Sequence, residues 1–340
     1  MTGPGHGRVA PPDGVRSLDE ASVAALVPAR PETGHKGTFG TLLAVCGSLD
    51  FVGAALLAGG AALRTGAGLV VLAVPATLQP IVAGRIPELI TMALPETAPY
   101  EVDAPAAAAA LAARRHTALL VGPGLRPGPA MRTVVVALLA APAPADADSP
   151  DSPAAHQVAA VVDAEALNGL AVTPDWWTGV RRPCVLTPHP GELARLEGRD
   201  VGAGDVERVG RARGAAARWG QVVVLKGART VVAAPDGEAV MADHANPAMG
   251  TGGTGDVLAG VIASLLAQGL EPWDAARLGV HLHGTAGEHV RERLGDAGLL
   301  ASDLLPELPR VRRHLARIAE RRAPERRPLG FALRAEGTDP

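Results

Sequence analysis

Aromatic residues are scarce in this chain of 340 residues, which has three Phe, one Tyr and four Trp. Aliphatic side chains must therefore pack the core, and the hydrophobic content of 47% supplies them. Cysteine is scarcer still. Cys46 and Cys184 both stand in apolar, strand-like runs. We expect buried free thiols in a reducing compartment, and neither a disulfide framework nor a cysteine-rich metal site.

Long apolar runs and a strong charge of one sign are also missing. The N-terminus lacks the apolar segment of a signal peptide, and no uncharged run is convincing as a membrane helix. The net charge of −3 argues against a nucleic-acid or membrane-surface role for the whole chain. These absences predict a soluble, cytoplasmic globular protein that binds neither nucleic acid nor membrane.

Glycine, in contrast, is concentrated in one informative stretch, Asn246–Gly260, which reads NPAMGTGGTGDVLAG. Apolar residues recur at a helical period after it, so we expect a helix to start at Asp256. A glycine-rich turn before a helix N-terminus presents unpaired backbone N–H groups and partial positive charge. The stretch therefore predicts an anion site, usually for phosphate, formed by Gly252, Gly253, Thr254 and Gly255.

Asp256 needs an explanation, because it places a carboxylate in an anion site. It could merely cap its helix. Alternatively, it could take a proton from a hydroxyl while the glycine amides hold the phosphoryl group that the hydroxyl attacks. A plain cap does not need four glycines, which favours the second interpretation. The string is not a dinucleotide fingerprint, since it lies late in the chain without a ribose-binding acid, and no Lys-Ser/Thr follows as in a Walker A loop.

Apolar strands alternate with helical segments through most of the chain. The pattern predicts an α/β fold in one domain, with a mostly parallel central sheet and helices on both faces. A capping box at Ser17–Glu20 would open a short first helix, and a hairpin is expected over residues 230–241. We expect a disordered tail over 1–16, one domain over 17–309, a low-complexity insertion over 140–157, and an Arg-rich C-terminal tail over 310–340. The expected strands are Thr41–Cys46, Gly68–Val74, Ile90–Leu94, Ala118–Val121, Val158–Val162, Val185–Thr187 and Val222–Leu225.

Four candidate site residues follow the ends of these strands: Gly122, Asp163, His189 and Lys226. Ligands bind at the carboxyl edge of an open α/β sheet, so one cleft could collect all four with Asp256. Lys226 could meet a phosphate as a point charge or simply close a strand in solvent. His189 could donate to a carbonyl or phosphate, or make a structural bond. Asp163 and Glu192 could hold Mg²⁺ through water.

Together these residues predict nucleotide-dependent phosphoryl transfer to a hydroxyl, with Asp256 as the base. His281 and His283 lie in a helical segment, and we interpret them as structural. The residues alone do not name the acceptor.

Seven ordered motifs resemble the ADP/ATP-dependent NAD(P)H-hydrate dehydratase family over about Ser17–Pro309. The GTGD element is shared by all ribokinase-like kinases, whereas HKGTFG together with TPHPGE is specific. The motifs are HKGTFG (His35–Gly40), CGSLDFVGAALLAG (Cys46–Gly59), VGPG (Val121–Gly124), VVDAEALN (Val161–Asn168), LTPHPGE (Leu186–Glu192), VLKGART (Val224–Thr230) and NPAMGTGGTGDVLAG (Asn246–Gly260).

The resemblance implies a ribokinase-like three-layer fold and repair of the S epimer of NADHX or NADPHX. ADP, or alternatively ATP, would phosphorylate the ring hydroxyl, and phosphate would then leave to regenerate NAD(P)H. By the family pattern, Asp256 would be the catalytic base. The substrate would contact Ala54, Gly124, His189 and Asp256. The adenine nucleotide would contact Lys226, Gly227, Ala228, Arg229, Thr230 and Gly255.

The resemblance also implies a homo-oligomer, by default a tetramer, working beside a separate epimerase. Only about 34 residues precede HKGTFG, so we expect the fused epimerase domain of many relatives to be absent. Gly250 replaces the commoner alanine of the family, and we expect little harm from this change. Two alternatives stay open: a ribokinase-like kinase of a small alcohol such as a thiazole or pyrimidine, and a nucleotide-binding module without turnover. Retention of Asp256 and Lys226 argues against the second.

Overall fold

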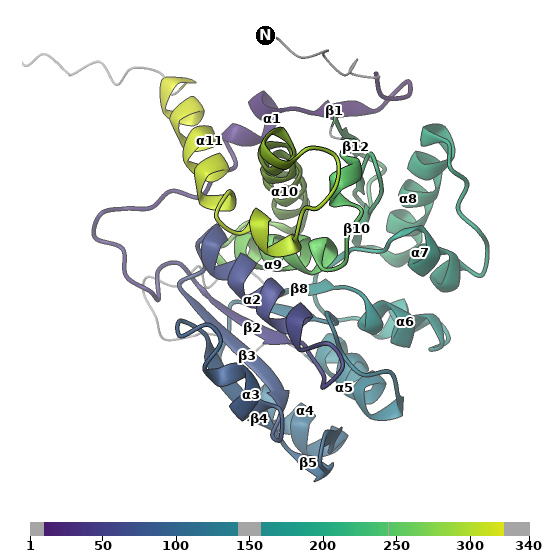
Figure 1. Ribbon diagram of the computed structural model, residues 1–340. Coiled ribbons are helices and arrows are strands. Elements are labelled where there is room, and N and C mark those ends of the chain that lie inside the picture. The colour runs from purple at the N-terminus through teal and green to yellow at the C-terminus, as the bar shows by residue number, and fades with distance from the viewer. Residues whose placement is uncertain (1–9, 142–157, 244, 323–340) are drawn as a thin grey trace, which may run out of the picture.

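Helices cover both faces of a central sheet in the computed structural model, which describes residues 10–141, 158–243 and 245–322 (Figure 1). Ten described strands form the sheet in the order β1-β12-β11-β10-β9-β8-β7-β2-β3-β4. The bounds of these strands are β1 Arg16–Leu18, β2 Thr41–Val45, β3 Leu69–Pro75, β4 Ile90–Leu94, β7 Ala118–Val121, β8 Ala159–Val162, β9 Cys184–Leu186, β10 Val222–Leu225, β11 Val231–Ala233 and β12 Ala239–Ala242. A separate hairpin pairs β5 (Glu96–Ala98) with β6 (Glu101–Val102).

Seven neighbouring strands, from β10 through β9, β8, β7, β2 and β3 to β4, run parallel. This confirms the predicted mostly parallel sheet. Strand β11 is antiparallel to both β10 and β12, which confirms the predicted hairpin. The register pairs Val45 with Val121, Val121 with Val162, and Val162 with Leu186. These strands therefore end level with one another, and the residues after them share one carboxyl edge.

Side chains of the central strands alternate between two buried layers, as expected for a sheet covered on both faces. In β2, Leu42 and Ala44 pack into one layer, and Leu43 and Val45 into the other. The first layer is covered by α1 Glu20–Ala24, α2 Val52–Thr65, α3 Gln79–Ala83, α9 Thr254–Ala267, α10 Pro272–Leu294 and α11 Leu308–Arg322. The second is covered by α4 Ala104–Ala112, α5 Pro129–Ala140, α6 Glu165–Ala171, α7 Pro190–Glu197 and α8 Asp205–Trp219. Three 3-10 helices, η1 Trp176–Gly179, η2 Pro247–Met249 and η3 Ala301–Leu304, complete the described elements.

Small residues let α9 lie directly against α2. A Cβ at Gly260 would fall 2.2 Å from the carbonyl oxygen of Ala58, so only glycine fits at this crossing. Ser264 Oγ donates to the carbonyl of Ala62 at 2.8 Å and fixes the same pair of helices. The close packing of α2 and α9 positions the N-terminus of α9 at the carboxyl edge of the sheet.

Several boundaries differ from those predicted. Asp19, not Ser17, is the N-cap of α1 and accepts from the backbone N–H of Ser22, because Ser17 is already in β1. Helix α9 begins at Thr254, two residues before Asp256. The boundary predicted between 309 and 310 lies inside α11, whose Val311 and Leu315 are buried.

The remaining predictions concern the two tails, the insertion, the cysteines and membrane helices. Residues 1–9 of the predicted disordered tail lie outside the described residues, but its predicted end at 16 is too late, because Val15 is buried and β1 begins at Arg16. Residues 142–157 of the predicted insertion also lie outside the described ranges, whereas Ala140 still belongs to α5. Of the predicted C-terminal tail, residues 323–340 lie outside the described ranges. Cys46 and Cys184 are buried free thiols, as predicted. Among the described helices, none is both long and apolar enough to cross a membrane.

Candidate functional site

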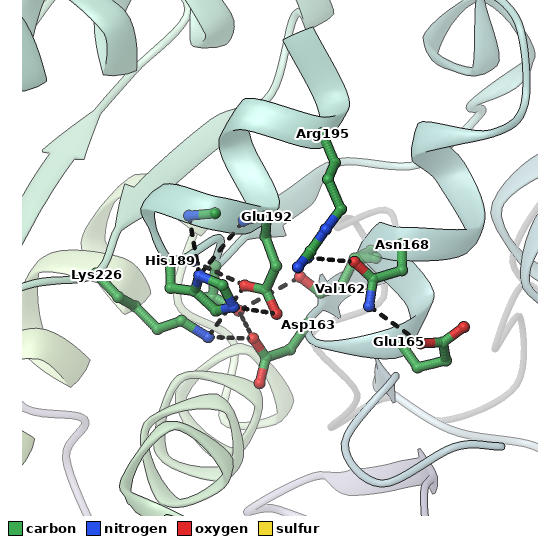
Figure 2. A network of polar contacts seen from close by, with 10 residues as sticks. Val162, Asp163, Glu165, Asn168, His189, Glu192, Arg195 and Lys226 are labelled. Carbon is green, nitrogen blue, oxygen red and sulfur yellow. Dashed lines mark hydrogen bonds and ion pairs between the residues drawn. The ribbon is translucent and has the colours of Figure 1, made fainter. Parts of the chain in front are cut away.

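Three charged side chains that follow different strands meet at the carboxyl edge of the sheet (Figure 2). Lys226 follows β10, and its Nζ donates to Asp163 Oδ1 at 2.7 Å and lies 3.7 Å from Glu192 Oε2. Asp163 follows β8, and its Oδ1 also accepts from Thr187 Oγ1 at 2.8 Å. The lysine and Asp163, predicted from strand ends alone, are therefore in contact. Thr187 belongs to the LTPHPGE motif, but no role was predicted for it.

Lys226 is held in its charged form by this arrangement. Burial by itself disfavours an ammonium, but the two carboxylates outweigh it and raise the pKa of Lys226. Burial also raises the pKa of Glu192, and Lys226 partly opposes that shift. Asp163 is only 1% exposed, so its carboxylate depends on the lysine for compensation of charge.

His189 caps α7 through a reciprocal capping box with Glu192. Its Nδ1 accepts from the backbone N–H groups of Gly191 at 3.0 Å and Glu192 at 3.3 Å. The backbone N–H of His189 donates to Glu192 Oε2 at 2.7 Å. A neutral ring in this geometry must carry its proton on Nε2. The structural bond foreseen for His189 is present, and a contact between Nε2–H and substrate stays a prediction.

Asp256 lies in the first turn of α9 beside this charged group. The N-cap of that helix is Gly253, with φ of 93° and no side-chain cap bond, so Asp256 is not the cap. Burial raises the pKa of Asp256 to about 7; the negative charge of Asp163 adds to the shift and Lys226 opposes it. A carboxyl group with this pKa can accept a proton near neutral pH.

The glycine loop before α9 approaches both Lys226 and Asp256. A Cβ at Gly255 would fall 3.5 Å from Lys226 Nζ, and one at Gly253 would fall 3.9 Å from Asp256 Oδ2. Thr254 uses its hydroxyl to donate to the carbonyls of Met249 at 3.0 Å and Thr251 at 3.1 Å. The loop is therefore braced internally, and its backbone amides at a helix N-terminus suit an anion. Binding of an anion by Gly252–Gly255 stays a prediction.

A cavity of about 390 Å³ lies beside Lys226 and Gly255, which form part of its wall. Its lining includes Lys226, Gly227, Ala228, Thr230 and Gly255, five of the six residues predicted to contact nucleotide. The sixth, Arg229, pairs through Nη1 with Asp205 Oδ2 of α8 at 2.5 Å, so its contact with nucleotide stays a prediction.

Residues that no sequence pattern assigned to this cavity also line it. They include Asn246, Met249 and His283. His283 Nε2 lies 2.8 Å from the carbonyl of Thr254, so it donates there and braces the loop. Its position depends on how α10 packs against α9, which helical periodicity does not reveal.

Ala54 and Gly124, predicted to contact substrate, lie side by side. Gly124 has φ of 66°, and a Cβ there would fall 2.8 Å from Ala54 Cβ and 2.7 Å from the carbonyl oxygen of Phe51. Only glycine fits this left-handed and crowded position. The loop after β7 is thereby pressed against the start of α2. Contact of either residue with a substrate stays a prediction.

The carboxylates of Asp163 and Glu192 fit a magnesium ion held largely by water and by a ligand. Within the described residues, no group of three or more His, Cys, Asp or Glu side chains could hold a metal. Two carboxylates beside the predicted anion site would match the preference of Mg²⁺ for few carboxylates, several waters and phosphate oxygens. Magnesium binding here stays a prediction.

Comparison with known proteins finds one family over most of the chain. A family model described as NAD(P)H-hydrate dehydratase matches residues 42–310. The ADP-dependent (S)-NAD(P)H-hydrate dehydratase of Xanthomonas campestris is 35% identical over 303 residues, which cover 89% of this chain and 98% of that protein. The bifunctional NAD(P)H-hydrate repair enzyme of Moorella thermoacetica is 44% identical over 301 residues, covering 88% of this chain. The chain spans about half the length of such bifunctional relatives, 54% in this case.

Solved structures agree with the sequence comparison. The ADP/ATP-dependent NAD(P)H-hydrate dehydratase of Bacillus subtilis, co-crystallized with ATP/Mg²⁺, has a TM-score of 0.73 and 32% identity, covering 89% of this chain and 99% of that one. A ribokinase-like superfamily protein of Enterococcus faecalis has a TM-score of 0.73 at 24% identity, covering 92% and 99%. The predicted ribokinase-like fold is confirmed.

Proposed function

Because the chain belongs to the NAD(P)H-hydrate dehydratase family, we propose that it repairs hydrated nicotinamide cofactors. The substrate would be (6S)-NADHX or (6S)-NADPHX, and the phosphoryl donor ADP or alternatively ATP. A relative of similar length is named as ADP-dependent, which favours ADP. The products would be NADH or NADPH, AMP and phosphate.

One observation carries this proposal: a half-buried carboxyl group whose pKa is raised to about 7 stands beside a lysine and a glycine-rich helix N-terminus. A base with this pKa is poised to take the proton of an alcohol near neutral pH. Lys226 and the amides of the loop would meet a phosphoryl group, and the cavity of about 390 Å³ lined by Lys226 and Gly255 would hold the adenine nucleotide. The hydroxyl would approach Asp256 from the predicted substrate side, to which Ala54 and Gly124 are assigned by the family pattern.

In the first step, Asp256 accepts the proton of the ring hydroxyl as its oxygen attacks the terminal phosphorus of ADP. The bond from that phosphorus to the bridging oxygen breaks, and AMP leaves. Lys226 stabilises charge on the transferred group, and the Gly252–Gly255 amides orient it. Mg²⁺, held by Asp163 and Glu192 through water, would supply further neutralisation of phosphate charge.

In the second step, the phosphorylated oxygen leaves the ring as phosphate and takes the electron pair of the C–O bond. The lone pair of the ring nitrogen forms a C=N bond as this happens. Loss of a proton from the neighbouring ring carbon then gives the dihydropyridine of NAD(P)H. The same groups that oriented the phosphoryl group, Lys226 and the loop amides, stabilise the departing anion.

Incubation with ADP, Mg²⁺ and NADHX tests the proposal. Absorbance of the reduced nicotinamide should rise, and AMP and phosphate should appear in equal amounts with it. An ordinary small-alcohol kinase of the same fold would instead leave a stable phosphorylated product. Nucleotide binding without any turnover would reject the enzymatic proposal.

The activity is expected to rise with pH through about 7. Asp256 can accept a proton only as a carboxylate, and its pKa is raised to about 7. Below that value it is protonated, so kcat/KM should fall about tenfold for each further pH unit. The measurement is a pH profile of kcat/KM, with nucleotide affinity measured over the same range. A profile that stays flat between about pH 5.5 and 8.5 while affinity is constant would contradict the assignment.

The family resemblance also supports a homo-oligomer, by default a tetramer, and cooperation with a separate epimerase that supplies the S epimer. A cytoplasmic location would match the intracellular substrate. These points remain proposals about the protein in its cell.

A further inference from the structure

A second cavity, of about 560 Å³, lies along the carboxyl edge beyond β2 and β7. Its walls come from the ends of β2, β3 and β4, the β5–β6 hairpin, and the loop and helix α5 that follow β7. Cavities of this size bind drug-sized ligands. The mechanism above uses none of its lining.

Ser48 belongs to the part of the cavity wall that follows β2. Gly47, just before it, donates its N–H to the carbonyl of Pro123 at 2.8 Å, which joins this wall to the Gly122–Gly124 turn. Cys46 directly follows β2; burial raises the pKa of its thiol, and the charges of Asp256 and Asp163 add to the shift. The residues after β2 therefore connect the cavity wall with the Gly122–Gly124 turn.

The hydroxyl of Ser48 is buried in the cavity wall without a partner. Ser48 is 5% exposed, and its Oγ finds no hydrogen-bond partner in the described part of the chain. A buried hydroxyl without a bond is costly, so its occurrence in a cavity wall points to a polar ligand that completes it.

Tyr100, the only tyrosine of the chain, also lines the cavity. It adopts φ of 66°, which is uncommon for a bulky side chain. The Glu96 carboxylate holds the turn, accepting from the N–H of Tyr100 at 3.0 Å and from Thr77 N and Oγ1 at 3.2 and 2.5 Å. The fold thus maintains a strained turn that adds an aromatic residue to an otherwise largely aliphatic lining. A planar base in the cavity could stack against this ring.

Arg126 supplies a positive charge at the rim of the same cavity. It is exposed and makes no ion pair in the described ranges. Asp50 and Glu101 also line the cavity and can accept from sugar hydroxyls. An aromatic residue, an unbonded hydroxyl, an unpaired arginine and two carboxylates together match a nucleotide with its base, sugar and phosphate.

We propose that this cavity holds the adenosine-phosphate half of the hydrated dinucleotide. The adenine would lie against Tyr100, Ser48 would donate to the pyrophosphate, and Arg126 would pair with a phosphate on the adenosine side. This inference rests on the proposed function, because it takes the hydrated nicotinamide ring to lie at Asp256. Substrate affinity would then come from a site separate from the cavity for the phosphoryl donor.

The experiment compares NADHX with hydrated nicotinamide mononucleotide, which lacks the adenosine-phosphate half. Arg126→Ala removes the charge. Tyr100→Asn removes the ring but keeps a residue that tolerates positive φ. Each variant should raise the KM for NADHX about tenfold, equivalent to about 1.4 kcal/mol, and leave the KM for the mononucleotide within about twofold. Ser48→Ala should raise the KM for NADHX several-fold.

Arg114→Ala is the matched control, because Arg114 is exposed near the opposite edge of the sheet and precedes β7. It should change neither KM, and the far-ultraviolet circular dichroism of every variant should match that of the unaltered protein. Equal KM values of the unaltered protein for the two substrates, or variants that weaken both equally, would overturn the inference. Failure of the unaltered protein to act on NADHX would instead reject the proposed function, so the two failures are distinguishable.

Discussion

Replacing Asp256 by asparagine is expected to lower kcat by about 10²–10⁴-fold, the usual contribution of a positioned base. The amide keeps the shape of the carboxyl group but cannot accept the proton of the ring hydroxyl. Because the carboxyl group does not cap α9 and burial raises its pKa to about 7, its removal should not destabilise the helix start. Affinity for ADP should change little, since the nucleotide cavity is lined by other residues.

The measurement is steady-state turnover of NADHX together with calorimetric titration of ADP. Asp236→Asn serves as the control, because Asp236 lies in the turn of the β11–β12 hairpin. Among the residues that the structure describes, its side chain accepts only from the N–H of Glu238, at 2.9 Å. It should leave kcat and ADP affinity unchanged. A kcat of Asp256→Asn within fivefold of the unaltered protein would remove Asp256 from the role of base. Loss of ADP binding in that variant would show instead that it shapes the nucleotide cavity.

The carboxyl-edge placement of the site could be predicted because parallel strands share one direction. Once the strands ending before Gly122, Asp163 and Lys226 are recognised as apolar runs of one sheet, their following residues must lie at the same edge. The register of β7, β8 and β9 bears this out. The contact between Lys226 and Asp163, separated by 63 positions in the chain, follows from that topology.

What could not be predicted depends on packing between helices and loops. His283 reaches the glycine loop only because α10 lies against α9, and Arg229 meets Asp205 only because α8 covers that side of β10. The unpaired hydroxyl of Ser48 likewise depends on which loops surround it. The raised pKa of Asp256 requires both its burial and the nearby charges, which no single motif contains. Local patterns specify elements and their ends, whereas these features arise from three-dimensional neighbours.

Replacing Lys226 by methionine is expected to affect both activity and stability. Methionine keeps an apolar stem of similar length but removes the charge that is proposed to meet the phosphoryl group, so kcat/KM should fall by about 10²–10³-fold. The variant also leaves the carboxylates of Asp163 and Glu192 buried without their cation, which lies 2.7 and 3.7 Å from them. Breaking a buried pair costs about 3–5 kcal/mol, and the lower end applies because the lysine side chain is 18% exposed.

The loss of stability should depend on pH in a definite direction. Without Lys226, the pKa of Glu192, already raised by burial, rises further. A carboxyl group whose pKa is higher in the folded than in the unfolded protein lowers the free energy of unfolding at any pH at which it is ionised. This cost disappears at a pH low enough to protonate the group in both the folded and the unfolded protein. The stability deficit of Lys226→Met should therefore be full at neutral pH and shrink toward acidic pH. Denaturant unfolding at several pH values measures it.

A second substitution separates the two roles of the lysine. In Lys226→Met/Asp163→Asn, one of the uncompensated carboxylates is neutral, so part of the lost stability should return while activity stays low. The two residues are in contact, and their effects on stability should therefore be strongly non-additive. Additive effects would show that Asp163 does not depend on Lys226 for its charge balance. Recovery of turnover in the double variant would mean that the lysine serves the fold alone, and phosphoryl stabilisation would then have to come from the loop amides before α9.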